Sequence, residues 1–324
     1  MESAFVELSL IVAIATIVAA IARLLKQPLI IAYIVAGILA SPYFLGLMES
    51  AETVASFAQI GVTLLLFIVG LQLNPQVLKK LGGVSLIVGL GQVIVTGFLG
   101  YFLAKALGFT GASLWYIAAA VTFSSTIIIM KLITDKGELN SLYGRLSVGL
   151  LIIQDIVVVF ILLFVSSNSA GLSFGELVFG TLFKAILLFV PLALFSMYIL
   201  PRIVKFVAET KELLFLFSFG WAFFVAAIFF YFEFSIEIGA LAAGVTLASS
   251  PFKDQISSKV RPIRDFFVIL FFVWLGSQIV VTNLSELLIP VIAISLFILI
   301  IEPLIVIALL GYLGFTRRTA FMTG

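Results

Sequence analysis

Neither cysteine nor histidine occurs among the 324 residues of the chain. Their absence excludes disulfides, thiol chemistry, histidine-based metal sites and acid–base work by imidazole. Charged residues make up only 10% of the chain, whereas an average soluble domain contains roughly 25%. A group that titrates near neutral pH in this chain must therefore be a carboxyl or a lysine in an unusual environment.

The chain is instead rich in apolar residues: 63% are hydrophobic and the mean hydropathy is +1.32. Because a membrane-spanning helix needs about 20 apolar residues, this composition predicts an all-α polytopic membrane protein with about 11 transmembrane helices. The hydrophobic segments lie at about 4–22, 28–44, 53–73, 83–104, 112–133, 142–165, 174–200, 212–232, 235–249, 263–282 and 286–314. Segments 28–44 and 235–249 are short and contain glycine, which is typical of transporters when it recurs in corresponding halves.

Lysine and arginine are distributed unevenly between the two sides of these segments. Connections after odd-numbered segments, together with the C-terminal tail, carry most of the basic residues, whereas the opposite side has only Lys105 and Lys184. Basic residues accumulate on the cytoplasmic side of a membrane. We therefore predict that the N-terminus lies outside and the C-terminus lies in the cytoplasm.

Two short patterns occur twice in the chain. Residues 36–41 (AGILAS) resemble residues 243–249 (AGVTLAS), with their glycines 207 positions apart. Residues 66–72 (LFIVGLQ) resemble residues 271–278 (FFVWLGSQ), with their glycines 206 positions apart. The two copies would cross the membrane in opposite directions, which predicts an inverted repeat, a pseudo-two-fold axis in the membrane plane and a site near its middle.

Gln154 and Asp155 lie in the middle of the apolar segment 142–165. A carboxylate at this depth costs about 2.5–3.5 kcal/mol on insertion scales, so it usually faces protein or water and has a function. We interpret Asp155, with Gln154 beside it, as a proton and cation site. Burial favours the protonated acid and an arriving cation favours the carboxylate, so one proton would exchange for one monovalent cation. The alternative is a neutral carboxyl in a structural hydrogen bond.

Four hydroxyl residues fall within five positions of the segment 112–133: Thr122, Ser124, Ser125 and Thr126. If the helix is unwound there, hydroxyls can replace lost backbone bonds and the freed carbonyls can ligate a cation. We therefore predict a broken helix at this point and assign all four residues to the site of Asp155. The simpler alternative is that they bond back to the preceding turn and pack against neighbouring helices.

Glu302 precedes Pro303 at a similar depth in the last segment. Proline frees the carbonyl of the residue four positions before it and bends a helix. Glu302 is therefore either a locally bonded residue at a kink or a contributor to the electrostatics of the site, and both interpretations stay open.

Six stretches of the chain resemble one family of membrane transporters. They are residues 28–42, 61–72, 124–126, 136–145, 154–155 and 239–244. The family is the monovalent cation:proton antiporter-2 family, and its Kef-type potassium/proton antiporters are the nearest branch. The resemblance implies an inverted-repeat, sodium/proton-antiporter-like fold with crossed, broken helices. It also implies that Asp155 is the exchange carboxylate and that Thr122–Thr126 is the break in the first broken helix.

The resemblance further implies how the chain is organised. We expect a single transmembrane antiporter domain over residues 1–324, in which a mobile core moves against a dimerisation scaffold. The scaffold would comprise about 4–73 and 212–282, the core about 83–165 and 286–314, and a linker helix about 174–200. A homodimer in a lipid bilayer is expected, and the family is commonest in bacterial inner membranes.

The chain departs from this family in two respects. The position of Glu302 is usually a lysine that pairs with the core carboxylate, and two neighbouring carboxyls leave the stoichiometry open. The family also continues beyond Arg317 and Arg318 with a second broken helix and a final helix, and Kef-type members often add a regulatory cytosolic nucleotide-binding domain. The repeat offset places the counterpart of the break beyond Gly324, so we expect a C-terminally incomplete fold.

Taken together, these features predict a secondary active antiporter that exchanges K+ or Na+ for H+ by alternating access. We expect no enzymatic activity, no resident cofactor or metal, and no nucleic-acid partner. The alternatives are a gated, channel-like K+ efflux pathway and a non-transporting membrane scaffold. Proton movement driven by an imposed cation gradient separates the three, whereas the choice between K+ and Na+ depends on ligand number and cavity size.

Overall fold

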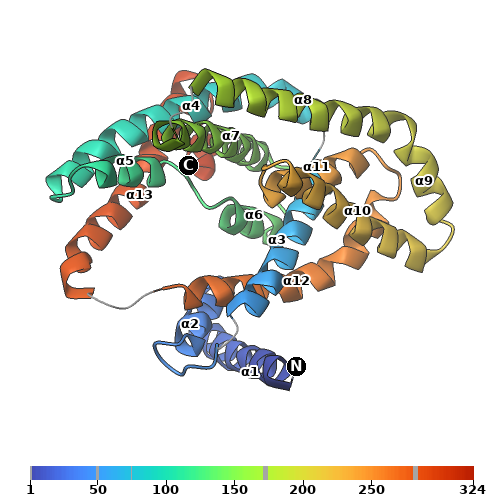
Figure 1. Ribbon diagram of the computed structural model, residues 1–324, viewed down its shortest axis with the longest axis horizontal. Coiled ribbons are helices and arrows are strands. Elements are labelled where there is room, and N and C mark those ends of the chain that lie inside the picture. Colours follow the sequence, from blue (N-terminus) through green and yellow to red (C-terminus); the bar gives the residue numbers. More distant parts are fainter. Residues whose placement is uncertain (1, 49–50, 74, 171–173, 280–283) are drawn as a thin grey trace. The chain divides into compact units, whose positions relative to one another are not determined.

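A computed structural model describes residues 2–48, 51–73, 75–170, 174–279 and 284–324 (Figure 1). Regular structure in these ranges is entirely α-helical, which confirms the all-α prediction. The helices are α1 (Glu2–Leu24), α2 (Leu29–Ala40), α3 (Ala51–Gln72), α4 (Pro75–Ala106), α5 (Ala112–Ala120), α6 (Thr126–Asp135), α7 (Leu142–Ala170), α8 (Phe174–Tyr198), α9 (Leu200–Val207), α10 (Lys211–Tyr231), α11 (Ile236–Leu247), α12 (Lys253–Ser277), α13 (Leu284–Tyr312) and α14 (Arg317–Thr323).

Within the described residues, six helices are long and apolar enough to cross a membrane, as judged by length and composition: α1, α3, α4, α8, α10 and α13. The shorter apolar helices α2 and α11 coincide with the two segments that were expected to be short. The protein is therefore an integral membrane protein, although this criterion does not confirm the number of about 11 transmembrane helices.

The basic stretch 253–264 is helical, whereas the tenth hydrophobic segment was predicted to begin only at about 263. It forms the first half of α12 because one face of this polar stretch is apolar. Ile256 and Val260 are buried at helical spacing, and Arg264 continues the same buried row. Hydropathy averaged along the chain conceals such an amphipathic helix, which is recognised by its period instead.

The described chain divides into two compact units. Unit 1 comprises residues 1–71 and 196–283, and unit 2 comprises residues 72–195 and 284–324. In unit 1, α12 packs against α2 and α10, α1 packs against α2, and α10 packs against α11. In unit 2, α4 packs against α5, α7 and α13, while α14 packs against α13 and α7.

Glycines allow the helices of unit 1 to cross with their backbones in contact. A Cβ atom on Gly37 would overlap the carbonyl oxygen of Val273, and one on Gly244 would overlap that of Phe67. The two glycines are 207 positions apart in the sequence, and the two carbonyls are 206 positions apart. The crossing of α2 with α12 therefore has the same contacts as the crossing of α3 with α11.

Glycines also bring the helices of unit 2 close around α4. A Cβ atom on Gly89 would meet Ile153 of α7, and one on Gly91 would meet Leu309 of α13. Farther along α4, a Cβ atom on Gly100 would meet Val121, just after the end of α5. Small residues let membrane helices approach closely. Gln92, which follows Gly91, therefore lies where α7, α13 and the end of α5 converge on α4.

Candidate functional site

The helix predicted to break at the hydroxyl cluster is interrupted there. α5 ends at Ala120 and α6 begins at Thr126, so the predicted break is confirmed. Ser125 has an extended backbone and its hydroxyl accepts a hydrogen bond from the Ile128 N–H, at 3.4 Å. A serine in this conformation is a favourable N-cap, which explains why the helix restarts at this residue.

The carbonyl of Thr122 lies in the break and is free of the helical ladder. Its oxygen accepts hydrogen bonds from two side-chain amides, those of Gln92 at 3.2 Å and Gln154 at 3.5 Å. The Thr122 hydroxyl donates back to the Ala119 carbonyl at 2.6 Å. The freed carbonyl is therefore satisfied by α4 and α7, and these amides replace the backbone donors that the break removed.

Asp155 contacts the other end of the break. The Thr126 hydroxyl lies 3.3 Å from Oδ1 and 3.5 Å from Oδ2 of this carboxyl. Both residues are half-buried, whereas the neighbouring Gln154 is only 1% exposed. The first turn of α6 is thus placed against the carboxyl in the middle of α7, as expected if the two belong to one site.

Glu302 contacts the middle of the break. Its Oε1 accepts hydrogen bonds from the Ser124 hydroxyl at 2.6 Å and from the Gln92 amide at 3.2 Å. The residue is 8% exposed and belongs to α13, which is distant in sequence from both partners. These contacts are long-range, so Glu302 is more than a locally bonded residue at the Pro303 kink.

Gln92 joins the two groups of contacts. Its Oε1 accepts a hydrogen bond from the Gln154 amide at 2.8 Å, and its Nε2 donates to Glu302. Gln92 is fully buried, as is Thr96, whose hydroxyl lies 3.2 Å from the same amide nitrogen. Neither residue was predicted from the sequence, although a polar residue in the apolar segment 83–104 carries the same signal that singled out Asp155.

The structure therefore brings together most of the predicted residues. Thr126 contacts Asp155, Ser124 contacts Glu302, and the backbone of Thr122 contacts Gln154. The hydroxyl of Ser125, in contrast, caps α6 and the residue is exposed.

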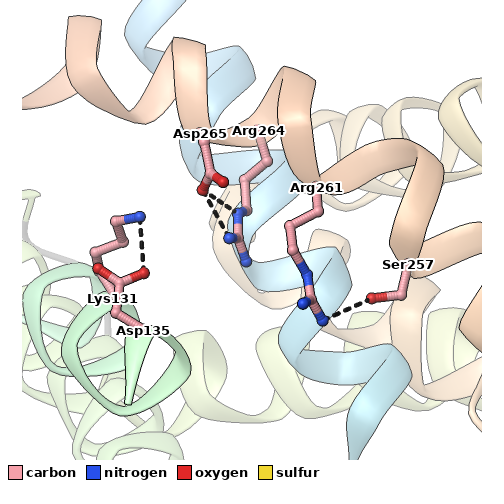
Figure 2. Close-up of polar contacts among 6 residues, drawn as sticks. All are labelled: Lys131, Asp135, Ser257, Arg261, Arg264 and Asp265. Atoms are coloured by element: carbon pink, nitrogen blue, oxygen red, sulfur yellow. Dashed lines mark hydrogen bonds and ion pairs between the residues drawn. The ribbon is translucent and has the colours of Figure 1, made fainter. Parts of the chain in front are cut away.

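Two ion pairs each join residues of a single helix. Lys131 and Asp135 form an ion pair of 2.9 Å within α6, and Arg264 and Asp265 form one of 2.7 Å within α12 (Figure 2). Among the residues that the structure describes, no lysine or arginine lies within ion-pair distance of Glu302. Its carboxyl is instead held by the hydroxyl of Ser124 and the amide of Gln92, which are both uncharged donors.

Comparison with known proteins places the chain in a transporter family. Residues 10–324 match the family described as sodium/hydrogen exchanger, transmembrane. The chain belongs to this family. Its members are transporters, which agrees with the expectation that the protein is not an enzyme and confirms the resemblance to monovalent cation:proton antiporters.

Individual relatives agree with this assignment. The chain is 29% identical over 305 residues to K(+) efflux antiporter 6 of Arabidopsis thaliana, covering 92% of this chain and 51% of the relative. It is 30% identical over 299 residues to the glutathione-regulated potassium-efflux system protein KefC of Escherichia coli, covering 88% of this chain and 44% of the relative. The chain thus spans about half the length of the curated relatives it matches.

A solved structure shares the fold. The sodium proton antiporter MjNhaP1 of Methanocaldococcus jannaschii superimposes with a TM-score of 0.63 at 18% identity. The match covers 99% of this chain and 81% of that chain. The antiporter fold is therefore present over essentially the whole chain.

Proposed function

We propose that the protein is a secondary active antiporter that exchanges a monovalent cation for H+ across a membrane by alternating access. The observation that carries this proposal is the placement of Asp155. It is an ionisable group in the middle of an apolar helix, and it contacts Thr126 at the start of the half-helix α6. A carboxyl at membrane depth is expected to take part in transport.

The exchange follows from competition for this one carboxyl. When Asp155 is ionised, its two oxygens and the Thr126 hydroxyl offer the hard oxygen ligands that an alkali cation binds. When a proton binds, the carboxyl is neutral and the cation leaves. Because the empty, ionised carboxyl is costly to carry through an apolar region, the site crosses the membrane loaded with one ion or the other, which couples the two fluxes.

The relatives suggest which cation to test first. Those named above are K+ efflux proteins, whereas the structural neighbour is a sodium proton antiporter. Since the sequence similarity to the K+ proteins is greater, we propose K+ as the principal substrate and Na+ as the competitor.

We further propose that unit 1 is the scaffold and dimerisation part and that unit 2 is the mobile core. In support, unit 2 contains every residue of the candidate site, and unit 1 contains the matched glycine crossings of α2 with α12 and of α3 with α11. The matched contacts of these crossings support an inverted repeat. Gly61 also lies against the backbone of Phe267, which is its own counterpart at an offset of 206, as expected at a two-fold axis.

The antiport itself is tested by reconstituting the protein into liposomes that contain a pH-sensitive dye. An imposed K+ gradient should drive saturable proton movement in the opposite direction to the cation. Cation movement without coupled protons would favour the channel-like alternative, and the absence of both fluxes would favour the non-transporting scaffold.

We also propose an extracytoplasmic N-terminus and a cytoplasmic C-terminus in the inner membrane of a bacterium. Since the chain lacks cysteine, Thr110→Cys and Lys253→Cys each create a single thiol at an exposed position. A membrane-impermeant maleimide should label the first variant in intact cells and the second only after permeabilisation. The reverse pattern would show that the basic connections lie outside and would invert the topology.

A further inference from the structure

One buried oxygen of the site has no hydrogen-bond partner among the residues that the structure describes. Gln154 is 1% exposed, and within the described part of the chain its Oε1 accepts no hydrogen bond. An unpaired buried acceptor is unfavourable, and such a group in a native protein calls for an explanation, for example an ion that it ligates. Gln154 contacts the Thr122 carbonyl at one end of the helix break, and Asp155 contacts Thr126 at the other end, so this oxygen belongs to the group of residues where a cation is proposed to bind.

The orientation of this amide follows from a chain of hydrogen bonds that runs in one direction. An amide nitrogen only donates and an amide oxygen only accepts. The Gln92 nitrogen lies 3.2 Å from three oxygens, those of the Thr122 carbonyl, Oε1 of Glu302 and the Thr96 hydroxyl, and the Thr122 carbonyl can only accept. The Gln92 oxygen must then point the other way, where it accepts a hydrogen bond from the Gln154 nitrogen. The oxygen of Gln154 is the end of this chain.

We propose that Glu302 is a positioning residue that acts through Gln92 to present the Gln154 oxygen as a ligand for the transported monovalent cation. This rests on the proposed function, in which the cation binds beside Asp155. The property of Glu302 that matters is its hydrogen-bond acceptor, not its charge. Ser124, whose hydroxyl donates to the same Oε1 at 2.6 Å, keeps this acceptor in place against the helix break.

A donor at position 302 would have the opposite effect. A lysine, which the resemblance leads one to expect there, has no acceptor and would compete for the Gln92 oxygen. Turning the Gln92 amide would present its nitrogen to Gln154. The Gln154 oxygen would then accept a hydrogen bond from Gln92 and could no longer bind a cation. Where the resemblance leads one to expect a charged lysine at position 302, this chain thus has a glutamate that leaves the neutral Gln154 oxygen available as a ligand.

Two substitutions at position 302 separate an acceptor from a charge. Glu302→Leu removes the acceptor, whereas Glu302→Gln keeps an acceptor oxygen and removes only the charge. We expect Glu302→Leu to raise the cation KM about three- to tenfold, the effect of losing one hydrogen bond, with kcat changed less than about threefold. In Glu302→Gln the KM should lie within about twofold of the wild-type value, because this variant keeps the relay, the hydrogen bonds that run from position 302 through Gln92 to Gln154.

A double-mutant cycle with Gln92→Leu tests whether the two residues act through one relay. The double variant should have the KM of Gln92→Leu alone, since the second substitution removes nothing further. The proposal is overturned if the two substitutions raise KM by independent factors that multiply in the double variant. It is also overturned if folded Glu302→Leu has the wild-type KM, or if Glu302→Gln raises KM as much as Glu302→Leu does. If Glu302→Leu does not fold, Gln92→Leu and Glu302→Gln still decide it, since the first must raise KM and the second must not.

Cation binding to the purified protein, measured as thermal stabilisation by increasing K+, separates this inference from the proposed function. If K+ stabilises the wild-type protein saturably and stabilises Gln92→Leu less, but the wild-type protein shows no coupled transport, only the proposal of antiport is contradicted. Intact antiport with unchanged binding in Gln92→Leu would contradict only the relay.

Discussion

Replacing Asp155 with asparagine should abolish cation-coupled proton movement while leaving the protein folded in the membrane. Asparagine has nearly the same shape and can still accept the hydrogen bond from Thr126, but it neither ionises nor carries a proton. With the competing proton site removed, the exchange rate in liposomes should fall by at least about 100-fold, to the background leak, as expected when a group with no substitute is lost. The measurement is the dye response to a stepped K+ gradient.

Asp135→Asn is the matched control for this experiment. Asp135 lies in the same unit, at the end of α6, and its ion pair with Lys131 is partly exposed. Exposed i,i+4 pairs contribute only about 0.3–0.5 kcal/mol, so this variant should exchange at nearly the wild-type rate. Wild-type exchange in Asp155→Asn, or an equal loss in both variants, would refute the role of Asp155 as the exchange carboxyl.

The break and its carboxyl partner could be predicted from sequence because they violate a strong rule. Hydroxyl residues and an aspartate in apolar segments have few explanations other than an unwound helix and a buried polar site. The same rule applied to Gln92 would have found the residue that connects the site. It went unnoticed because a single uncharged amide costs less than a carboxylate and breaks no periodic pattern.

Pairings between distant segments could not be predicted in the same way. The sequence gives no sign that Glu302 bonds to Ser124 rather than to its own helix, because this depends on how α13 lies against α4 and the break. Helix ends were also misplaced where a polar stretch is amphipathic, as at the start of α12. Hydropathy reports the average environment of a segment, whereas these features depend on individual contacts.

The glycine crossings of unit 1 lead to the prediction with the largest expected effect on stability. Gly37→Ala and Gly244→Ala should each destabilise the protein, because the new methyl group would overlap a backbone carbonyl that cannot rotate away. The helix pairs would have to separate, which costs about 1–3 kcal/mol for overpacking and more where backbone is involved. Because the two crossings have matching contacts, the two losses should be similar. Thermal unfolding of the purified variants in detergent measures both.

Gly220→Ala provides the control within the same unit. Gly220 lies in α10, is exposed, and has no atom within 4 Å of the position that a Cβ would occupy. Alanine favours a helix over glycine by about 0.5–1 kcal/mol, so this variant should be as stable as the wild type or slightly more stable. A loss in Gly220→Ala equal to that in Gly37→Ala would mean that the glycines are needed for a reason other than close crossing. A large loss at Gly37 with none at Gly244 would show that the two crossings are energetically unlike, and would remove the main support for a two-fold repeat in unit 1.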